Sequence, residues 1–234
     1  PNLASVHADL CTSGLSGFVP YEYGYITLTY DSHAFSTQSP PAALEDLIEP
    51  AYAGKLICED PRTSSTGFSF LLWTIAHFGE DGYLDFWRSI RDSLLTITQG
   101  WGEAWSLLTH NEAPLMVSFS TDTAYAAMSG DPLRYRAYAP GEEGYRTVYG
   151  IGIVKGTRHV KLAQEFIDLL LSKEMQELIP ETEIMFPANA DATLPPAFER
   201  YAIVPQTVLS IPLDVVGEKM AQWLHAWETV ITQP

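Results

Sequence analysis

Apolar residues recur along the chain with two different periods. In "YGYITLTYD" (residues 23–31) aromatic and β-branched residues alternate, which is typical of a β-strand. In "VKLAQEFIDLLLSKEMQELI" (160–179) the apolar positions are three and four residues apart, which predicts an α-helix. A C-terminal helix over 214–232 would place five apolar residues on one stripe: Val216, Met220, Trp223, Trp227 and Ile231. We therefore expect both kinds of element, with the C-terminal tryptophans in the core.

Predicted strands and helices alternate along most of the chain. Strands are expected at 23–31, 54–60, 94–100, 113–120, 135–140 and 147–156. Helices are expected at 40–52, 65–78, 80–93, 102–112, 122–130, 160–179 and 214–232. This alternation predicts an α/β fold with a mainly parallel sheet. Ligands of such sheets bind outside the carboxyl ends of the strands, so the strand-to-helix joints 59–67, 98–105 and 117–125 form the candidate site.

Composition and charge narrow the class of protein. The chain has 234 residues and is 46% hydrophobic, enough for one large domain or two small lobes. No apolar run approaches the roughly 18 residues of a membrane span, and the first residues do not resemble a secretory signal, which is expected to lie outside this chain. The net charge of −16 disfavours nucleic acid as a partner, because its phosphates would be repelled. Such charge serves either solubility or attraction of cationic ligands.

Motifs for catalysis or metal binding are missing from the sequence. Two distant cysteines, Cys11 and Cys58, do not specify a disulfide, and the six histidines are scattered without metal-ligand spacing. No serine lies in a G-x-S-x-G elbow, and no close His–Asp or Cys–His pair is evident. The sequence thus favours binding without catalysis, with no metal and no cofactor.

The first joint carries hydroxyl side chains in the run Thr63 to Thr66, followed by Gly67. One serine or threonine here would cap the next helix by accepting a hydrogen bond from a free backbone N–H group. The same N–H groups, together with the hydroxyls of Ser64 and Ser65, would also bind an anion such as phosphate. Both interpretations stay open from the residues alone.

The other two joints combine aromatic, hydroxyl and acidic side chains. Trp101 lies between Gly100 and Gly102, where an indole either stacks on a flat or cationic ligand or packs as a lid. The third joint supplies candidate ligand contacts at Phe119, Ser120, Thr121, Asp122, Thr123 and Tyr125. Asp122 is either a helix N-cap or a counter-charge for a cation.

Five stretches resemble, in order and spacing, the bacterial periplasmic thiamine-binding proteins, which are solute receptors of thiamine ABC importers. They are "VPYEYGYITLTYDS", "EDPRTSSTGFSFLLW", "ITQGWGEAWSLL", "LMVSFSTDTAY" and "LAQEFIDLLLSKEMQELIP". The resemblance implies a two-lobe periplasmic-binding-protein fold of type II that captures thiamine, thiamine monophosphate or thiamine diphosphate. By position, Ser64 and Ser65 match phosphate-side hydroxyls, Trp101 matches a tryptophan of the site, and 119–125 match a segment at the ligand. Glu22, Tyr23 and Ile184 are further candidates for the hinge or the site.

The chain departs from that family in three places. Phe119 stands where the family has a tyrosine, and Ile184 stands where it has a tryptophan. The chain also begins well inside the family's length, so we expect the N-terminal part of one lobe to be missing. We expect 24–147 to form a complete lobe, 1–23 plus 148–234 to form the rest of the other lobe, and the hinges to lie near 19–26 and 139–149.

The resemblance also implies partners and a location. The expected partners are the small ligand and an ABC permease, and the expected location is the periplasm or the outer face of the cytoplasmic membrane. A lobe without its first strands would expose an unpaired edge and apolar surface, which predicts self-association. The alternatives are a receptor for another small cationic or phosphorylated solute, a stand-alone hydrolase or sensor module, and a half-receptor that binds nothing.

Overall fold

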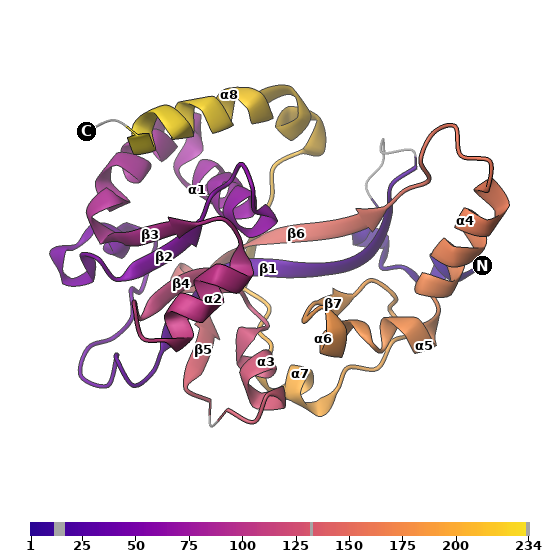
Figure 1. The fold of residues 1–234 in the computed structure, drawn as a ribbon, viewed down its shortest axis with the longest axis horizontal. Helices are drawn as coiled ribbons and strands as arrows, with labels where there is room; N and C mark the ends of the chain where they lie inside the picture. Colours follow the sequence, from indigo (N-terminus) through magenta and orange to yellow (C-terminus); the bar gives the residue numbers. More distant parts are fainter. Residues whose placement is uncertain (12–16, 132, 233–234) are drawn as a thin grey trace.

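The fold is built on one mixed β-sheet (Figure 1). The computed structural model describes residues 1–11, 17–131 and 133–232. The strands are β1 (Val19–Asp31), β2 (Leu56–Glu59), β3 (Leu94–Thr98), β4 (Leu115–Phe119), β5 (Tyr135–Tyr138), β6 (Glu143–Ile151), β7 (Phe186–Pro187) and β8 (Thr207–Leu209). Their order is β3-β2-β4-β1-β6-β8, with β5 and β7 also paired to β1. The long strand β1 therefore organises the sheet.

Helices surround this sheet. The α-helices are α1 (Ser65–Ser89), α2 (Trp101–Thr109), α3 (Asp122–Met128), α4 (Val160–Leu170), α5 (Lys173–Gln176), α6 (Ile179–Thr182), α7 (Pro196–Tyr201) and α8 (Leu213–Thr232). Short 3-10 helices cover Asn2–Ser5, Ala8–Leu10, Glu45–Ile48, Pro50–Tyr52, Ile90–Ser93 and Pro140–Glu142. None of the helices in the described ranges has the length and hydropathy of a membrane span.

The sheet is less parallel than the alternation of elements predicted. Strand β2 is parallel to β3 and β4, and β6 is parallel to β8, whereas β1 is antiparallel to β4, β5, β6 and β7. The prediction of a mainly parallel sheet is wrong because strand direction depends on long-range pairing that local periodicity does not record. The parallel part, β3-β2-β4, is the part that carries the three joints.

Side chains of the parallel strands alternate between two apolar layers. Cys58 and Val117 face the larger hydrophobic core, together with the buried residues of α1, whereas Ile57 and Met116 face a second cluster with Ala104 of α2. This alternation follows from the two-residue repeat of a strand. Helices α1 and α2 consequently pack on opposite faces of β3-β2-β4 and begin at the same edge.

Strands β1 and β6 continue past this part of the molecule toward α4–α7 (Figure 1). They pair from Val19 with Ile151 to Ile26 with Tyr145. A separate hydrophobic cluster lies at their far ends and includes Leu10 and Leu171. The strands β1 and β6 are thus continuous between two groups of helices. That hinges lie near 19–26 and 139–149 stays a prediction.

The C-terminal helix does not pack with the segment that precedes it. Trp223 and Trp227 of α8 are 2% and 1% exposed and belong to the larger core with Trp87 of α1. Figure 1 shows α8 lying alongside α1. The expectation that all of 148–234 lies with the other lobe is therefore wrong for α8, because its tryptophan stripe is buried against α1.

Local capping residues and glycines explain most of the other differences between the predicted and the observed helices. The helix expected over 160–179 is divided into α4 and α5 because the Ser172 hydroxyl accepts a hydrogen bond from Met175 N–H and starts a new turn. Gly79, with a φ of 74°, kinks α1 where two helices were expected. Residues 40–52 contain only 3-10 turns rather than an α-helix. Both cysteines are free thiols, with Cys11 exposed and Cys58 buried.

Candidate functional site

The three predicted joints meet at one edge of the sheet. β2, β3 and β4 are parallel neighbours, so their carboxyl ends lie side by side and lead into α1, α2 and α3. The Thr63 hydroxyl donates a hydrogen bond to the Gln99 carbonyl oxygen at 3.0 Å, which ties the first joint to the second. The structure thus brings together residues that are far apart in the sequence.

At the first joint, Ser64 is the N-cap of α1. Its hydroxyl accepts a hydrogen bond from Gly67 N–H at 3.3 Å, and its side chain is mostly buried. Ser65 follows as the first residue of the helix and is exposed. Capping satisfies only one of the free N–H groups of the first turn. The N-terminus of α1 therefore retains hydrogen-bond donors and the positive end of the helix dipole, which suit an anion.

Gly67 allows α1 to begin so close to the strand end. A Cβ at this position would lie 2.3 Å from the Glu59 carbonyl oxygen. Backbone atoms cannot rotate away, so we expect Gly67→Ala to shift the first turn and to lower the free energy of unfolding by about 1–3 kcal/mol, measured by urea unfolding. Gly102→Ala is the control, because nothing lies within 4 Å of that Cβ and alanine favours helix α2. Equal stability of the two variants would contradict the close approach.

At the second joint, Trp101 joins an aromatic cluster. Its ring stacks on Trp105 with centroids 5.3 Å apart and meets the edge of Tyr125 at 6.0 Å. Its indole N–H donates to the Ser118 hydroxyl at 2.7 Å. Trp105 is half-buried rather than fully in the core. One face of the Trp101 ring is therefore covered by Trp105, and a stacked ligand would need the other face.

At the third joint, the polar residues are more deeply buried than an open binding surface requires. Ser120 and Thr121 are 0% exposed, and neither hydroxyl has a hydrogen-bond partner among the described residues. The Thr123 hydroxyl accepts from Ala137 N–H at 2.8 Å, and Phe119 is half-buried against the larger core. Residues 120–123 lie beneath the edge that the carboxyl ends of β2, β3 and β4 form, which we call the strand-end edge. Any ligand contact from these residues would therefore have to follow a rearrangement.

Two acids are buried at this edge, and their charges interact. Asp122 is 1% exposed and accepts a hydrogen bond from the Thr29 hydroxyl at 2.7 Å. Burial raises its pKa to about 7, against the lowering effect of hydrogen bonds from Ser118, Thr29 and the Phe119 backbone. Glu59 is 0% exposed, and burial, with the charge of Asp122, raises its pKa well above the ordinary value. Neither Glu59 oxygen has a hydrogen-bond partner in the described ranges.

Glu59 was not among the site residues predicted from the sequence. The stretch "EDPRT" had the polar character of a surface turn, yet the last residue of β2 points into the interior. The available signal was its position, since it is an acid on a strand whose other residues are apolar. Unpaired buried acids at a strand-end edge are typical of functional sites.

The remaining candidates lie on β1 and near β7. Glu22 is 4% exposed and one of its oxygens, Oε2, has no hydrogen-bond partner within the described chain. Tyr23 stacks on Phe186, with ring centroids 5.4 Å apart. Ile184 has a φ of 60°, a strained conformation for a β-branched residue, and packs near Phe198. A strained backbone at a position expected to border the ligand is consistent with a functional turn.

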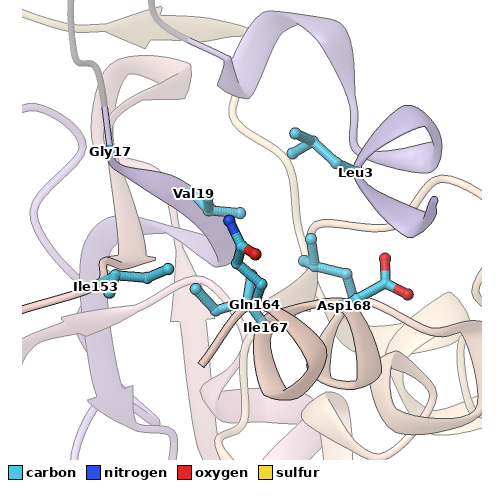
Figure 2. A pocket seen from close by; sticks show the side chains of 8 residues that line it. Leu3, Gly17, Val19, Ile153, Gln164, Ile167 and Asp168 are labelled. Atoms are coloured by element: carbon cyan, nitrogen blue, oxygen red, sulfur yellow. The ribbon is translucent and has the colours of Figure 1, made fainter. Parts of the chain in front are cut away.

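An apolar hollow lies elsewhere. It has a volume of about 360 Å³ and is lined by residues at or beside the first 3-10 helix, β1, the end of β6 and α4: Leu3, Gly17, Val19, Ile153, Gln164, Ile167, Asp168 and Leu171. Figure 2 shows these side chains grouped around it. None of them belongs to the strand-end edge. Among the described residues, no group of three His, Cys, Asp or Glu side chains is placed to hold a metal ion.

Comparison with known proteins decides the family. A family model described as bacterial extracellular solute-binding protein matches residues 1–206. The chain belongs to this family. Thiamine-binding periplasmic proteins of Brucella abortus and Escherichia coli are 35% and 31% identical to this solute-binding protein, over 90% and 92% of its length. The chain covers 62% and 64% of the length of these two relatives.

Solved structures agree with the family and the fold. A periplasmic thiamin binding protein superimposes with a TM-score of 0.87 and 30% identity, covering 98% of this chain and 72% of its own. The periplasmic binding protein AfuA from Actinobacillus pleuropneumoniae has a TM-score of 0.84 at 18% identity, which shows the fold alone. The predicted two-lobe α/β receptor fold is confirmed. The family description and the periplasmic relatives also confirm the predicted location outside the cytoplasm.

Proposed function

We propose that this solute-binding protein captures thiamine or a thiamine phosphate and delivers it to the permease of an ABC importer, without catalysing a reaction. The observation that carries this proposal is the 35% identity, over 90% of the chain, with a protein named for thiamine binding. No cofactor takes part besides the ligand, which would be thiamine, thiamine monophosphate or thiamine diphosphate.

The strand-end edge supports this function chemically. The free N–H groups of α1 and the Ser65 hydroxyl suit a phosphate. Trp101 and Tyr125 offer aromatic surface for the rings, including the cationic ring. Each part of a thiamine phosphate therefore has a complementary group at or beside this edge.

Native mass spectrometry tests the proposed function. The chain is mixed separately with thiamine, thiamine monophosphate and thiamine diphosphate, and a matched sample contains a sugar phosphate. We expect one thiamine-type ligand retained per chain, with its mass unchanged because nothing is hydrolysed. Retention of none of the three thiamine compounds would contradict the proposal, and a dephosphorylated product would support the hydrolase alternative instead.

Trp101 is expected to contribute strongly to affinity. Replacing Trp101 with alanine should cost about 1–3 kcal/mol of thiamine binding, the size of a desolvated contact between a cation and an aromatic ring. Fluorescence titration measures the loss, and Trp101→Phe is the control because it retains a flat ring. Equal affinity of the wild type and Trp101→Ala would remove Trp101 from the binding site.

A second candidate function is capture of another small cationic or phosphorylated solute. Two observations favour it, because Phe119 lacks a hydroxyl and Ile184 offers no aromatic ring beside the site. Competition in the same mass-spectrometric experiment separates the two functions. A sugar phosphate or an aminophosphonate that displaces thiamine at equal concentration would favour the second candidate.

Self-association also stays a prediction, and α4 supplies a surface for it. Leu162, Phe166 and Leu169 are 63%, 56% and 56% exposed and lie on one side of the helix. Exposed apolar stripes of this kind are typical of contact surfaces. We expect light scattering of the isolated chain at micromolar concentration to show a dimer or larger species, and Phe166→Glu to shift it toward monomer. A compact wild-type monomer would contradict this prediction.

A further inference from the structure

The indole N–H of Trp101 leads into a line of buried hydrogen bonds. It donates to the Ser118 hydroxyl of β4 at 2.7 Å. The Ser118 hydroxyl is in turn a hydrogen-bond partner of the Asp122 carboxyl, on α3. The same carboxyl accepts a hydrogen bond from the Thr29 hydroxyl of β1 at 2.7 Å. Side chains from four elements are thus joined, and we call Trp101, Ser118, Asp122 and Thr29 the Trp101 network.

Strand register explains why these side chains meet. In the antiparallel pairing of β1 with β4, Thr29 lies opposite Met116. Met116 faces the second hydrophobic cluster, against which Trp101 packs. Because side chains of a strand alternate between its two faces, Ser118 lies on the same face as Met116. Thr29 and Ser118 therefore both lie on the side of the sheet that carries α2.

The donors and acceptors of the Trp101 network fit one order at pH 8. A tryptophan N–H can only donate, so the Ser118 oxygen accepts from it and the hydroxyl hydrogen is left to donate. Asp122 is mostly ionised at this pH, since its pKa is about 7, and a carboxylate can only accept. Both hydroxyls consequently donate to Asp122. Ser118 and Asp122 are 0% and 1% exposed, and this shielding from solvent strengthens each bond.

The backbone around Trp101 does little to fix its ring. Gly100 is the N-cap of α2 without a side-chain hydrogen bond, and Gly102 follows Trp101. A Cβ added at either glycine would meet nothing within 4 Å, so close packing does not confine this turn. Stacking on Trp105 fixes the plane of the ring but not its direction within that plane. The hydrogen bond to Ser118 sets that direction, because hydrogen bonds depend steeply on angle.

We propose that Asp122 is a positioning residue for ligand capture, acting through the Ser118 hydroxyl to hold the Trp101 ring in the orientation on which the ligand stacks. The inference rests on the proposed function and deepens it, because Asp122 acts without touching the ligand. A ring that is already held in place loses less freedom when the ligand binds, so its affinity is higher than that of a ring held by stacking alone. The same role accounts for an acid buried beneath the strand-end edge rather than exposed at it.

A double-mutant cycle tests this role. Calorimetry at pH 8 measures the affinity for thiamine and for thiamine monophosphate in the wild type, Ser118→Ala, Trp101→Ala and the variant with both changes. We expect Ser118→Ala to weaken both compounds about fivefold, the usual effect of one lost hydrogen bond. Once Trp101 is alanine, Ser118→Ala should weaken them less than about twofold further, because the hydroxyl acts only through that ring. Asp122→Asn should behave in the same way, since an amide has one acceptor oxygen where a carboxylate has two.

The indole N–H signal of Trp101 gives a second readout, which needs no ligand. In 1H–15N spectra this signal is identified by its disappearance in Trp101→Phe. We expect Ser118→Ala to move it upfield, because the proton loses its acceptor, and Asp122→Asn to move it as well. The indole signals of Trp223 and Trp227, on α8, should stay in place in both variants.

Thr74→Val is the matched control. The buried Thr74 hydroxyl, in the middle of α1, accepts a hydrogen bond from the Trp87 indole N–H at 2.9 Å. The variant loses the same kind of bond and should change both affinities less than about twofold. Thermal unfolding confirms that each variant is folded, and Ser118→Cys, which has only a weak donor and acceptor, replaces Ser118→Ala if the latter unfolds.

Three results would overturn the inference and leave the proposed function intact, because the wild type still binds. One is a Ser118→Ala variant with wild-type affinity. Another is a loss from Ser118→Ala that is equally large with alanine and with tryptophan at position 101. The third is a Trp101 indole signal that neither Ser118→Ala nor Asp122→Asn moves. A folded wild type that binds neither thiamine compound would overturn the proposed function and the inference together.

Discussion

Replacing Trp227 with alanine is expected to lower the free energy of unfolding by about 3–5 kcal/mol, the usual cost of emptying a buried tryptophan position. Trp227 is 1% exposed, and its ring meets the Trp87 ring edge-on at 5.7 Å. The Arg62 guanidinium lies 5.6 Å from its centroid and also pairs with Asp60 at the first joint. Trp227 therefore anchors α8 both to α1 and to the residues that precede the candidate anion site. Urea unfolding measures the loss.

Met220 provides the control for this prediction. It lies on the same helix and the same stripe but is 43% exposed. We expect Met220→Ala to cost less than about 1 kcal/mol, because little apolar surface leaves the interior. If Trp227→Ala costs no more than Met220→Ala, the packing of α8 against α1 is wrong.

The second large effect concerns the buried carboxyl of Asp122. Its pKa in the folded protein, about 7, lies above that of an unfolded aspartate, so the folded state holds its proton more firmly. The associated stability is fully present below about pH 4 and is lost as the pH rises through about 7. The loss amounts to at most about 4 kcal/mol by pH 8, where a buried charge has formed. We expect the free energy of unfolding to fall over this range.

Asp122→Asn should remove the part of this fall that Asp122 contributes, whereas the buried acids Glu22 and Glu59, whose pKa values are also raised, keep their own contributions. An amide oxygen can still accept the hydrogen bond from Thr29, and it carries no charge. Chemical unfolding from pH 4 to pH 8 measures the difference, with Asp81→Asn as the control for loss of an exposed carboxylate. Parallel pH profiles of the wild type and Asp122→Asn would show that Asp122 is not held in the interior.

The joints were predictable because each carries a local signal. A hydroxyl run before Gly67 marks the start of α1, and a glycine-flanked Trp101 marks the start of α2. Because these residues follow strands, they were predicted to meet at one edge of a parallel sheet. This required β2, β3 and β4 to be parallel neighbours, as they are. The family resemblance, carried by motifs rather than by composition, was confirmed by the match over residues 1–206.

Other features depend on contacts that a local pattern does not record. The antiparallel direction of β1, the return of α8 to α1, and the division of the 160–179 helix at Ser172 follow from tertiary packing or from a competing cap. The deep burial of Asp122 likewise depends on Thr29, which is distant in the sequence.

A crystal structure of this chain grown with thiamine monophosphate would show whether a thiamine phosphate binds at the carboxyl ends of β2, β3 and β4. We expect the phosphate at the N-terminus of α1, with its oxygens within about 3 Å of the Ser65 hydroxyl or the first free N–H groups. The rings should lie toward Trp101, and the edge of β3-β2-β4 should border the ligand. A ligand found in the apolar hollow between β1 and α4, or crystals that contain no ligand at saturating concentration, would contradict this expectation.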